Sequence, residues 1–481
     1  MRNNLSSQIT LTRVPEKYYK PENAYEYSLL TRFEKVRTHI YATMEEGAGE
    51  LARELATSIR ERQREGKQFV LAVPGGRSPY PIFRQLIRMH REEGLSLRNV
   101  VIFLIYEFYP LTNEAYSNMH LLREVFLDHV DIPKGNVYSP DGFIDKNDIY
   151  DFCRRYEQRI RECGGIDCML LGVGQAGTIG VNSAGTSVSS RTHLVLMDDT
   201  SRKESAQLFR SIDNVPAGVI TMGLGTLMEA AKVVLVAWGE NKSRIIRETI
   251  ETPASDAVPS TCLQHHPNAK VVIDLSAAGQ LTRISHPWLV TPCVWDNKLI
   301  RRAIVWLCAQ TDKPILKLTN KDYSEHGLGE LLALYGSAYN VNIRIFNDIQ
   351  HTITGWPGGK PNADDSNRPE RAKPYPKRVI VFSPHPDDDV ISMGGTLRRL
   401  CDQQHEVHVA YETSGNIAVG DDEVIRYCEY LRDVSERYAP GETPIREKAE
   451  EIIRYLRYEK KEDGQPERPD VLFMKGTIRR E

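Results

Sequence analysis

The chain has 481 residues, which is more than a single hydrophobic core usually serves, so two or three domains are expected. Its 65 acidic and 62 basic residues leave a net charge of −3, which excludes a general attraction to nucleic acid or to an anionic membrane. The sequence begins without an apolar signal segment, and no apolar run approaches the ~20 residues of a membrane helix. Eight scattered cysteines without a CxxC pair favour reduced thiols. We therefore expect a soluble, cytoplasmic protein.

In the first part of the chain, predicted helices alternate with predicted strands. An amphipathic helix is expected from Thr43, which can cap its amino end, to Arg64. The apolar run 69–73 then has the length of a buried parallel strand, and a glycine turn and a helix over 80–93 follow it. Further strands are expected over 99–105, 167–171, 217–222, 232–238 and 270–274. This alternation predicts a parallel α/β sheet with helices on both faces.

The character of the sequence changes after residue 290. Residues 295–348 are predicted to be mainly helical, and residues 354–377 are rich in glycine, proline and charge, as in a linker. A new strand over 378–382 opens a second α/β domain, and 471–474 is expected to be another strand. We therefore predict an α/β domain, a helical connector, a linker and a partial second α/β domain, over 1–290, 291–350, 351–377 and 378–481.

A glycine turn, residues 74–79, lies between the first predicted buried strand and its helix. Backbone N–H groups at such a turn, with the amino end of a helix behind them, form a cradle for an anion, and glycine lets a ligand come close. Gly75, Gly76 and Ser78 are the candidate binding residues. The alternative is an ordinary turn without a ligand.

A second glycine-rich loop, residues 172–177, follows the strand predicted over 167–171. Together the two loops, Asn182 and the segments 129–132, 185–192, 221–227 and 239–242 resemble the glucosamine-6-phosphate deaminase/isomerase family over residues 35 to 290. The resemblance implies a parallel-sheet sugar-phosphate isomerase-like domain that binds a phosphorylated amino sugar, and it leaves a homo-oligomer as an open option. It also implies phosphate-binding roles for Arg202 and Lys242, whose charges suit a phosphate. Solvated surface charges are the alternative for both residues.

The positions that carry the family's proton transfers are replaced. Its Asp-Glu-Tyr is Tyr-Glu-Phe here, so Tyr106 stands at the general base, and an unperturbed phenol with a pKa of about 10 is protonated near neutrality. Thr178 stands where the family has the histidine that helps to open the ring, with Ala176 and Ser183 at its carboxylate partners. Glu107 is the nearby carboxylate that remains, as a candidate catalytic residue or, in the preferred interpretation, a structural hydrogen-bond partner.

A second motif, residues 383–389, directly follows the strand predicted over 378–382. Imidazole and carboxylate groups on one turn can converge on a divalent metal, although proline and aspartate are also common in surface turns. With the segments 394–397 and 413–415, the motif resembles the PIG-L (LmbE-like) family of zinc-dependent N-acetyl sugar deacetylases. The resemblance implies that His385 and Asp388 bind zinc and that Asp387 is the general base.

The third zinc ligand of that family is a histidine far downstream, and no histidine lies between residues 411 and 481 here. His405 and His408 lie on the strand after the motif's helix, and side chains three apart on a strand point to opposite faces, so at most one could face the site. About a hundred residues are too few for a complete domain of this kind. We therefore expect a truncated domain that holds zinc weakly.

Two functions remain open at this stage. The first is a bifunctional enzyme of amino-sugar phosphate metabolism, with isomerase/deaminase (hydrolase) chemistry followed by deacetylation, two consecutive reactions. In the second, the front domain is a catalytically silent sugar-phosphate sensor or scaffold for the deacetylase. The replaced acid–base residues favour the second for the front domain. A lactonase of the same superfamily is a third interpretation, against which Thr178 counts because lactone hydrolysis needs a positioned base.

Overall fold

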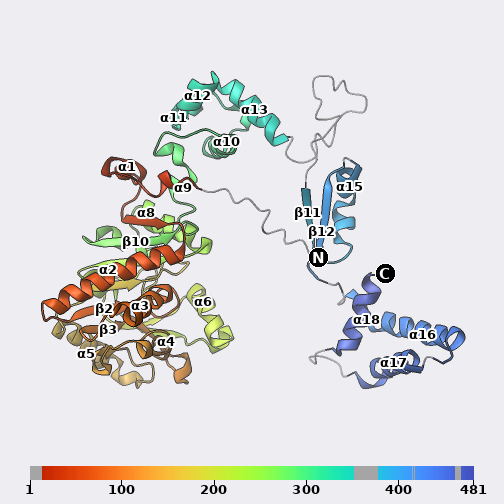
Figure 1. The fold of residues 1–481 in the computed structure, drawn as a ribbon, viewed down its shortest axis with the longest axis horizontal. Coiled ribbons are helices and arrows are strands. Elements are labelled where there is room, and N and C mark those ends of the chain that lie inside the picture. Colours follow the sequence, from red (N-terminus) through yellow and green to blue (C-terminus); the bar gives the residue numbers. More distant parts are fainter. Residues whose placement is uncertain are drawn as a thin grey trace. The chain divides into compact units, whose positions relative to one another are not determined.

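The computed structural model describes residues 14–350, 378–402, 404–413, 415, 418–441, 443–460 and 467–480. The chain separates into two compact units, Met1–Ala303 and Ile304–Glu481 (Figure 1). The predicted linker over 351–377 lies outside the described residues. No helix in the described part of the chain is long and apolar enough to cross a bilayer.

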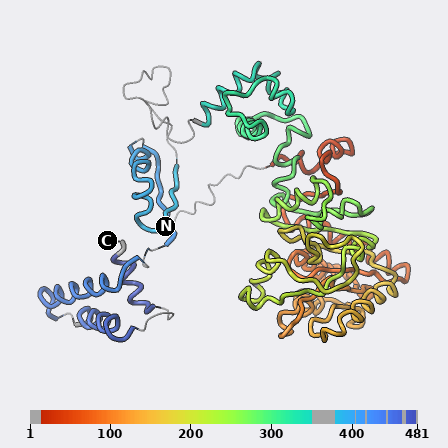
Figure 2. Tube along the Cα trace, turned by 180° about the vertical axis from the view of Figure 1, so that it is seen from behind, coloured from red at the N-terminus to blue at the C-terminus, as the bar shows by residue number. Residues whose placement is uncertain are grey.

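The first unit is built on a seven-stranded parallel sheet with the strand order β1-β10-β9-β6-β2-β3-β5. Its strands are β1 (Arg37–Tyr41), β2 (Phe69–Val73), β3 (Val100–Leu104), β5 (Val137–Tyr138), β6 (Cys168–Leu171), β9 (Val233–Ala237) and β10 (Ala269–Asp274). Every residue of β2, β3, β6 and β9 is buried, as expected of continuous apolar runs in a parallel sheet. The trace in Figure 2 shows the red amino-terminal segments beside green segments, in agreement with the pairing of β1 and β10. The predicted parallel α/β fold is confirmed.

The first unit also contains a separate, smaller sheet of three strands. It joins β4 (Tyr106–Tyr109), β8 (Gly218–Thr221) and β7 (His193–Leu196) in antiparallel pairs. The run 217–222 is therefore a strand, as predicted, but it belongs to this sheet and not to the parallel one. An apolar run indicates that a strand is buried, but it does not indicate with which strand it pairs.

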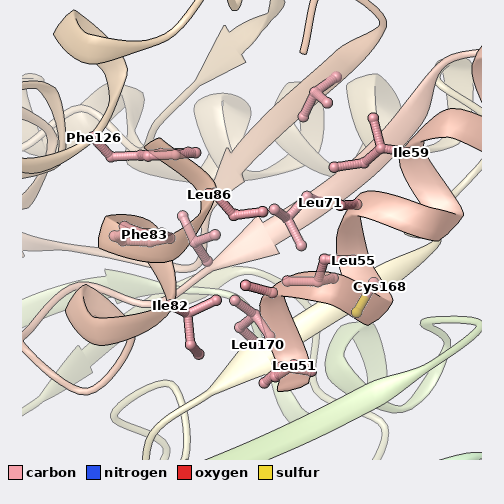
Figure 3. Close-up of a cluster of buried hydrophobic side chains, with 14 of the residues drawn as sticks. Leu51, Leu55, Ile59, Leu71, Ile82, Phe83, Leu86, Phe126, Cys168 and Leu170 are labelled. Atoms are coloured by element: carbon pink, nitrogen blue, oxygen red, sulfur yellow. The ribbon is translucent and has the colours of Figure 1, made fainter. Parts of the chain in front are cut away.

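Helices α2 (Met44–Arg64) and α3 (Tyr80–Glu93) pack against each other and contribute to the main core of the first unit. The Thr43 side chain accepts a hydrogen bond from the backbone N–H of Glu46 and caps α2, as predicted. Figure 3 shows the apolar faces of the two helices over side chains of the sheet: Leu51, Leu55, Ile59, Ile82, Phe83, Leu86, Leu71, Cys168 and Leu170. The other helices of this unit are α1 (Ala24–Leu30), α4 (Asn118–Val125), α5 (Ile149–Glu162), α6 (Asp199–Phe209), α7 (Leu224–Met228), α8 (Ser243–Glu251) and α9 (Thr282–Ser285).

A buried ion pair ties the two ends of the first unit together. The Nε of Arg283 lies 2.8 Å from Oε1 of Glu34, with side chains 1% and 2% exposed. Nη2 of Arg283 also donates to the carbonyl of Thr38. Burial raises the pKa of Glu34 to about 7, and the guanidinium of Arg283 opposes this rise by favouring the charged carboxylate.

The next region is helical, as predicted. Helix α10 (Asn297–Thr311) crosses the boundary between the units, and α11 (Asn320–Glu325), α12 (Gly329–Tyr335) and α13 (Ala338–Gln350) follow. The hydroxyl of Tyr323 donates to Oδ1 of Asn342 at 2.8 Å and joins α11 to α13 in a buried contact.

The last part of the second unit contains β11 (Arg378–Ser383), α15 (Asp388–Asp402) and β12 (Glu406–Tyr411), with the two strands paired in parallel. Helices α16 (Asp421–Tyr438), α17 (Thr443–Arg454) and α18 (Pro469–Arg480) follow. The strand expected over 471–474 is wrong, because these residues lie in α18. Val471, Met474 and Ile478 recur at helical spacing and pack into an apolar cluster with α16 and α17, a period that the four-residue run alone did not display.

Candidate functional site

A cleft of about 450 Å³ opens in the first unit, around loops that follow the carboxyl ends of the parallel strands. Ligands of open parallel sheets bind at this edge, because the loops that can converge on a ligand lie there. Segments from six parts of the chain contribute lining residues: 74–80 after β2, Tyr106 and Phe108 of β4, Asn118 and Leu121 of α4, 172–181 after β6, 197–208 around α6, and 241–242 after β9.

The first glycine loop has two positions that need glycine and lies directly before a helix. A Cβ atom on Gly75 would lie 2.4 Å from Cγ of Asn118, and Gly76 has a φ of 90°, so both positions need glycine. The loop is held in place by Trp238, whose indole N–H donates to the carbonyl of Ser78 at 2.9 Å. Helix α3 begins at Tyr80, so the amino end of a helix follows the loop.

Two cations were predicted to bind phosphate, and the structure places them differently. Lys242 lines the cleft with a side chain that is 17% exposed. Arg202 is not among the lining residues, and its Nη2 donates to the carbonyl of Ile212 at 3.3 Å. The helical period explains this difference, because Arg202 lies on another face of α6 than the residues that line the cleft. The lining residues of α6 are Ser201, Glu204, Ser205 and Leu208.

Glu107 is 1% exposed and is not among the residues that line the cleft. Its carboxylate accepts hydrogen bonds from the hydroxyl of Ser117 at 2.7 Å and from the backbone N–H groups of Phe108, Asn118 and Met119 at 2.9 to 3.0 Å. Burial raises the pKa of Glu107, against the lowering effect of these bonds. The carboxylate joins β4 to the amino end of α4, which supports the structural role over the catalytic one.

The two replaced chemical positions both lie in the cleft. The hydroxyl of Tyr106 would be 3.5 Å from a Cβ atom on Gly76, so it faces the first glycine loop. Burial, and then the charge of Glu107, raise the pKa of Tyr106 above its ordinary value and keep the phenol protonated near neutrality. Thr178 is 7% exposed on the second loop. The cleft therefore has a phenol and a hydroxyl where the resemblance implies a carboxylate and an imidazole.

Glu204, a carboxylate that lines the cleft, was not predicted from the sequence. Its Oε1 lies 3.0 Å from Nζ of Lys242 and accepts from the backbone N–H of Gln175 at 3.3 Å. Asn118, which packs beside Gly75, was also missed. The helical spacing of Ser201, Glu204 and Leu208 was the available signal for Glu204, because it places these three side chains on one face.

In the second unit, the motif turn brings His385 and Asp388 together. Nδ1 of the histidine lies 3.0 Å from Oδ2 of the aspartate, which also accepts from the backbone N–H of His385 at 3.1 Å. The hydroxyl of Ser383 donates to the carbonyl of His385 at 2.6 Å and accepts from the backbone N–H of Asp389 at 3.1 Å. Asp387 lies in the same turn, and its backbone N–H donates to the carbonyl of His385.

The donor set for a metal is incomplete within the residues that the structure describes, since no group of three His, Cys, Asp or Glu side chains there could hold an ion. His408 is in register with Ile380, about 10 Å along the strand from Ser383, and its Nε2 lies 2.9 Å from Oε1 of Glu406. His405 precedes β12, at the opposite end of the strand from the motif turn. A catalytic zinc usually takes three protein ligands, and the motif turn brings together one histidine and one aspartate of the kind that can bind it.

Two known protein families match this chain, each over a different part of it. A family described as glucosamine-6-phosphate isomerases/6-phosphogluconolactonase matches residues 42–273. A second family, described as GlcNAc-PI de-N-acetylase, matches residues 380–459. The first match contains the cleft, and the second contains the motif turn.

Individual relatives extend these matches. A protein of Bacteroides thetaiotaomicron described as glucosamine-6-phosphate deaminase-like is 60% identical over 482 residues, which are 100% of this chain and 72% of that protein. The glucosamine-6-phosphate deaminase of Bacillus velezensis is 36% identical over 231 residues, 48% of this chain and 95% of the enzyme. A solved structure of a monomeric glucosamine-6-phosphate deaminase is 34% identical and covers 50% of this chain and 99% of its own, with a TM-score of 0.48.

Proposed function

Because the chain belongs to the glucosamine-6-phosphate deaminase-like family, we propose that its first unit binds a phosphorylated amino sugar and deaminates it very slowly or not at all. One observation carries this proposal. The cleft keeps the glycine loop and Lys242 but has Tyr106 and Thr178 at the positions of proton transfer. Such a cleft has donors for an anion, and neither the phenol of Tyr106 nor the hydroxyl of Thr178 exchanges protons readily near neutrality.

The proposed roles follow from the chemistry of each group. The phosphate binds the backbone N–H groups around Gly75 and Gly76, the hydroxyl of Ser78 and the ammonium of Lys242, which all donate hydrogen bonds. The hydroxyls of Tyr106 and Thr178 orient the sugar by hydrogen bonds. Neither hydroxyl accepts a proton readily, because the pKa of the phenol is raised and an aliphatic hydroxyl does not titrate in a useful range. The unit then acts as a sensor or scaffold in amino-sugar phosphate metabolism.

Calorimetric titration tests the proposal. The full chain should bind glucosamine-6-phosphate and should bind unphosphorylated glucosamine much more weakly, because the glucosamine lacks the charged group that the loop and Lys242 recognise. Equal affinity for the two sugars would contradict the proposal.

A second function is favoured by the contact between His385 and Asp388 in the second unit. We propose that these residues are ligands of a zinc ion in a deacetylase-like site and that Asp387 is its general base. Zinc would supply a polarised water at such a site. The test is zinc binding by the unmodified chain and by its His385→Ala and His408→Ala variants.

A further inference from the structure

In the proposed phosphate site, the carboxylate of Glu204 already forms an ion pair with the ammonium of Lys242. Oε1 of Glu204 lies 3.0 Å from Nζ of Lys242, and the two side chains are 31% and 17% exposed. The same oxygen accepts from the backbone N–H of Gln175 in the second glycine loop. One carboxylate therefore holds a side-chain donor and a backbone donor that both face the cleft.

The fold makes room for this carboxylate. Asp198 accepts a hydrogen bond from the backbone N–H of Ser201 at 2.9 Å and fixes the start of α6, so that Glu204 comes onto the face that lines the cleft. Gly174 lies close to this carboxylate, because a Cβ atom there would be 3.3 Å from Oε2 of Glu204. The carboxylate is thus placed by a capped helix and lies against the second glycine loop.

The ion pair between Glu204 and Lys242 opposes the binding of a phosphate. Lys242 attracts a phosphate, and the carboxylate beside it both neutralises that ammonium and repels the incoming anion. A ligand anion can form an ion pair with Lys242 only if the contact between Lys242 and Glu204 is broken. Exchanging one single negative charge for another brings little gain, whereas exchanging it for a double negative charge strengthens the interaction with Lys242.

We propose that Glu204 is a built-in counter-anion that a ligand phosphate displaces from Lys242. This inference rests on the proposed function of the first unit and names its ligand class more narrowly. The cleft selects phosphate monoesters, which carry close to two negative charges at neutral pH, over esters or acids with a single charge. Glu204 is thus a specificity-determining residue of the binding cleft.

Calorimetric titration of the full chain with glucosamine-6-phosphate and with the singly charged glucosamine-6-sulfate tests this inference. Glu204→Gln should bind the phosphate about fivefold more tightly, the size expected when a half-buried ion pair no longer has to be broken. It should also reduce the preference for phosphate over sulfate. The control is Glu229→Gln, because Glu229 is exposed, pairs with Arg191 and does not line the cleft, and it should bind as the unmodified chain does.

The outcomes separate this inference from the function on which it rests. If the unmodified chain binds glucosamine-6-phosphate and Glu204→Gln binds it equally or less well, the counter-anion role is wrong and the proposed function stands. Weaker binding by this variant alone would indicate that the carboxylate contacts the ligand's amino group. If the unmodified chain does not bind the phosphate at all, the proposed function fails, and this inference fails with it.

Discussion

The cleft of the first unit and the motif turn of the second differ in how their residues are brought together. Both follow a parallel strand, but Lys242 and the loop at Ser78 come from distant parts of the chain, whereas His385 and Asp388 are three residues apart. Every residue of β2 is buried in a seven-stranded sheet, while Ile380 and Phe382 on β11 are 54% and 65% exposed.

This difference shows that a short segment can form a motif locally, whereas a complete site needs residues from distant segments. Hydrogen bonds within the motif turn, between Ser383, His385 and Asp389, accompany the close contact of the His385 and Asp388 side chains. A third donor has to come from a different segment, as Lys242 does in the first unit. The cleft of the first unit has that tertiary framework, with a phenol and a hydroxyl at Tyr106 and Thr178. The motif turn has its histidine and aspartate in contact, with fewer surrounding elements among the described residues.

The largest expected effect concerns catalysis in the first unit. Deamination of glucosamine-6-phosphate by this chain should be about 10²–10⁴-fold slower than by the Bacillus velezensis enzyme, because a missing general base costs about that much and Tyr106 does not replace it. Turnover of both proteins is measured side by side by ammonia release. Comparable turnover would show that the cleft has kept deaminase chemistry, and it would contradict this prediction.

The next effect concerns the stability of the framework that positions the cleft. Arg283→Met should lower the free energy of unfolding of the first unit by about 3–5 kcal/mol, because it leaves the carboxylate of Glu34 buried without its partner. Chemical denaturation followed by tryptophan fluorescence measures the change. Arg191→Met is the matched control, because its pair with Glu229 is exposed and should contribute less than about 1 kcal/mol. Similar losses in the two variants would contradict the assignment.

The third prediction separates the two cations that the sequence singled out. Lys242→Met should weaken binding of glucosamine-6-phosphate about 30-fold, since a hydrogen bond to a charged group contributes about 2 kcal/mol. Arg202→Met should change the affinity by less than about twofold, within the scatter expected for a side chain outside the site, because Arg202 contacts Ile212 and does not line the cleft. Calorimetry on both variants decides this, and a large loss with Arg202→Met would restore the original assignment.

The smallest expected effect concerns zinc. After dialysis the 481-residue chain should retain less than one zinc per molecule, because His385 and Asp388 supply two of the three protein ligands of a catalytic zinc. His385→Ala should lose what remains, and His408→Ala should not, since His408 contacts Glu406 away from the motif turn. Stoichiometric zinc that is lost in both variants would reveal a complete local site.

Much of the first unit could be predicted from local patterns. The helix over 80–93 and the buried strand over 69–73 have the predicted bounds, because a helical or strand period is set by neighbouring residues. The glycine loop was also found, since positions such as Gly76 that need an unusual backbone conformation have few alternatives to glycine. The family followed from the order of several such motifs.

The sequence by itself thus determined helices α2 and α3, the buried strands β2, β3, β6 and β9, and the two glycine loops. It also placed Tyr106 and Thr178 where the resemblance implies proton-transferring residues. Only the tertiary structure decided that the run 217–222 pairs in the smaller sheet, that Glu107 anchors α4, and that Glu204 rather than Arg202 faces the cleft. The physical reason is the range of the interactions. Backbone periods and turns depend on residues a few positions apart, whereas the contact between Glu204 and Lys242 joins segments 38 residues apart and exists only after the loops have been assembled on the sheet.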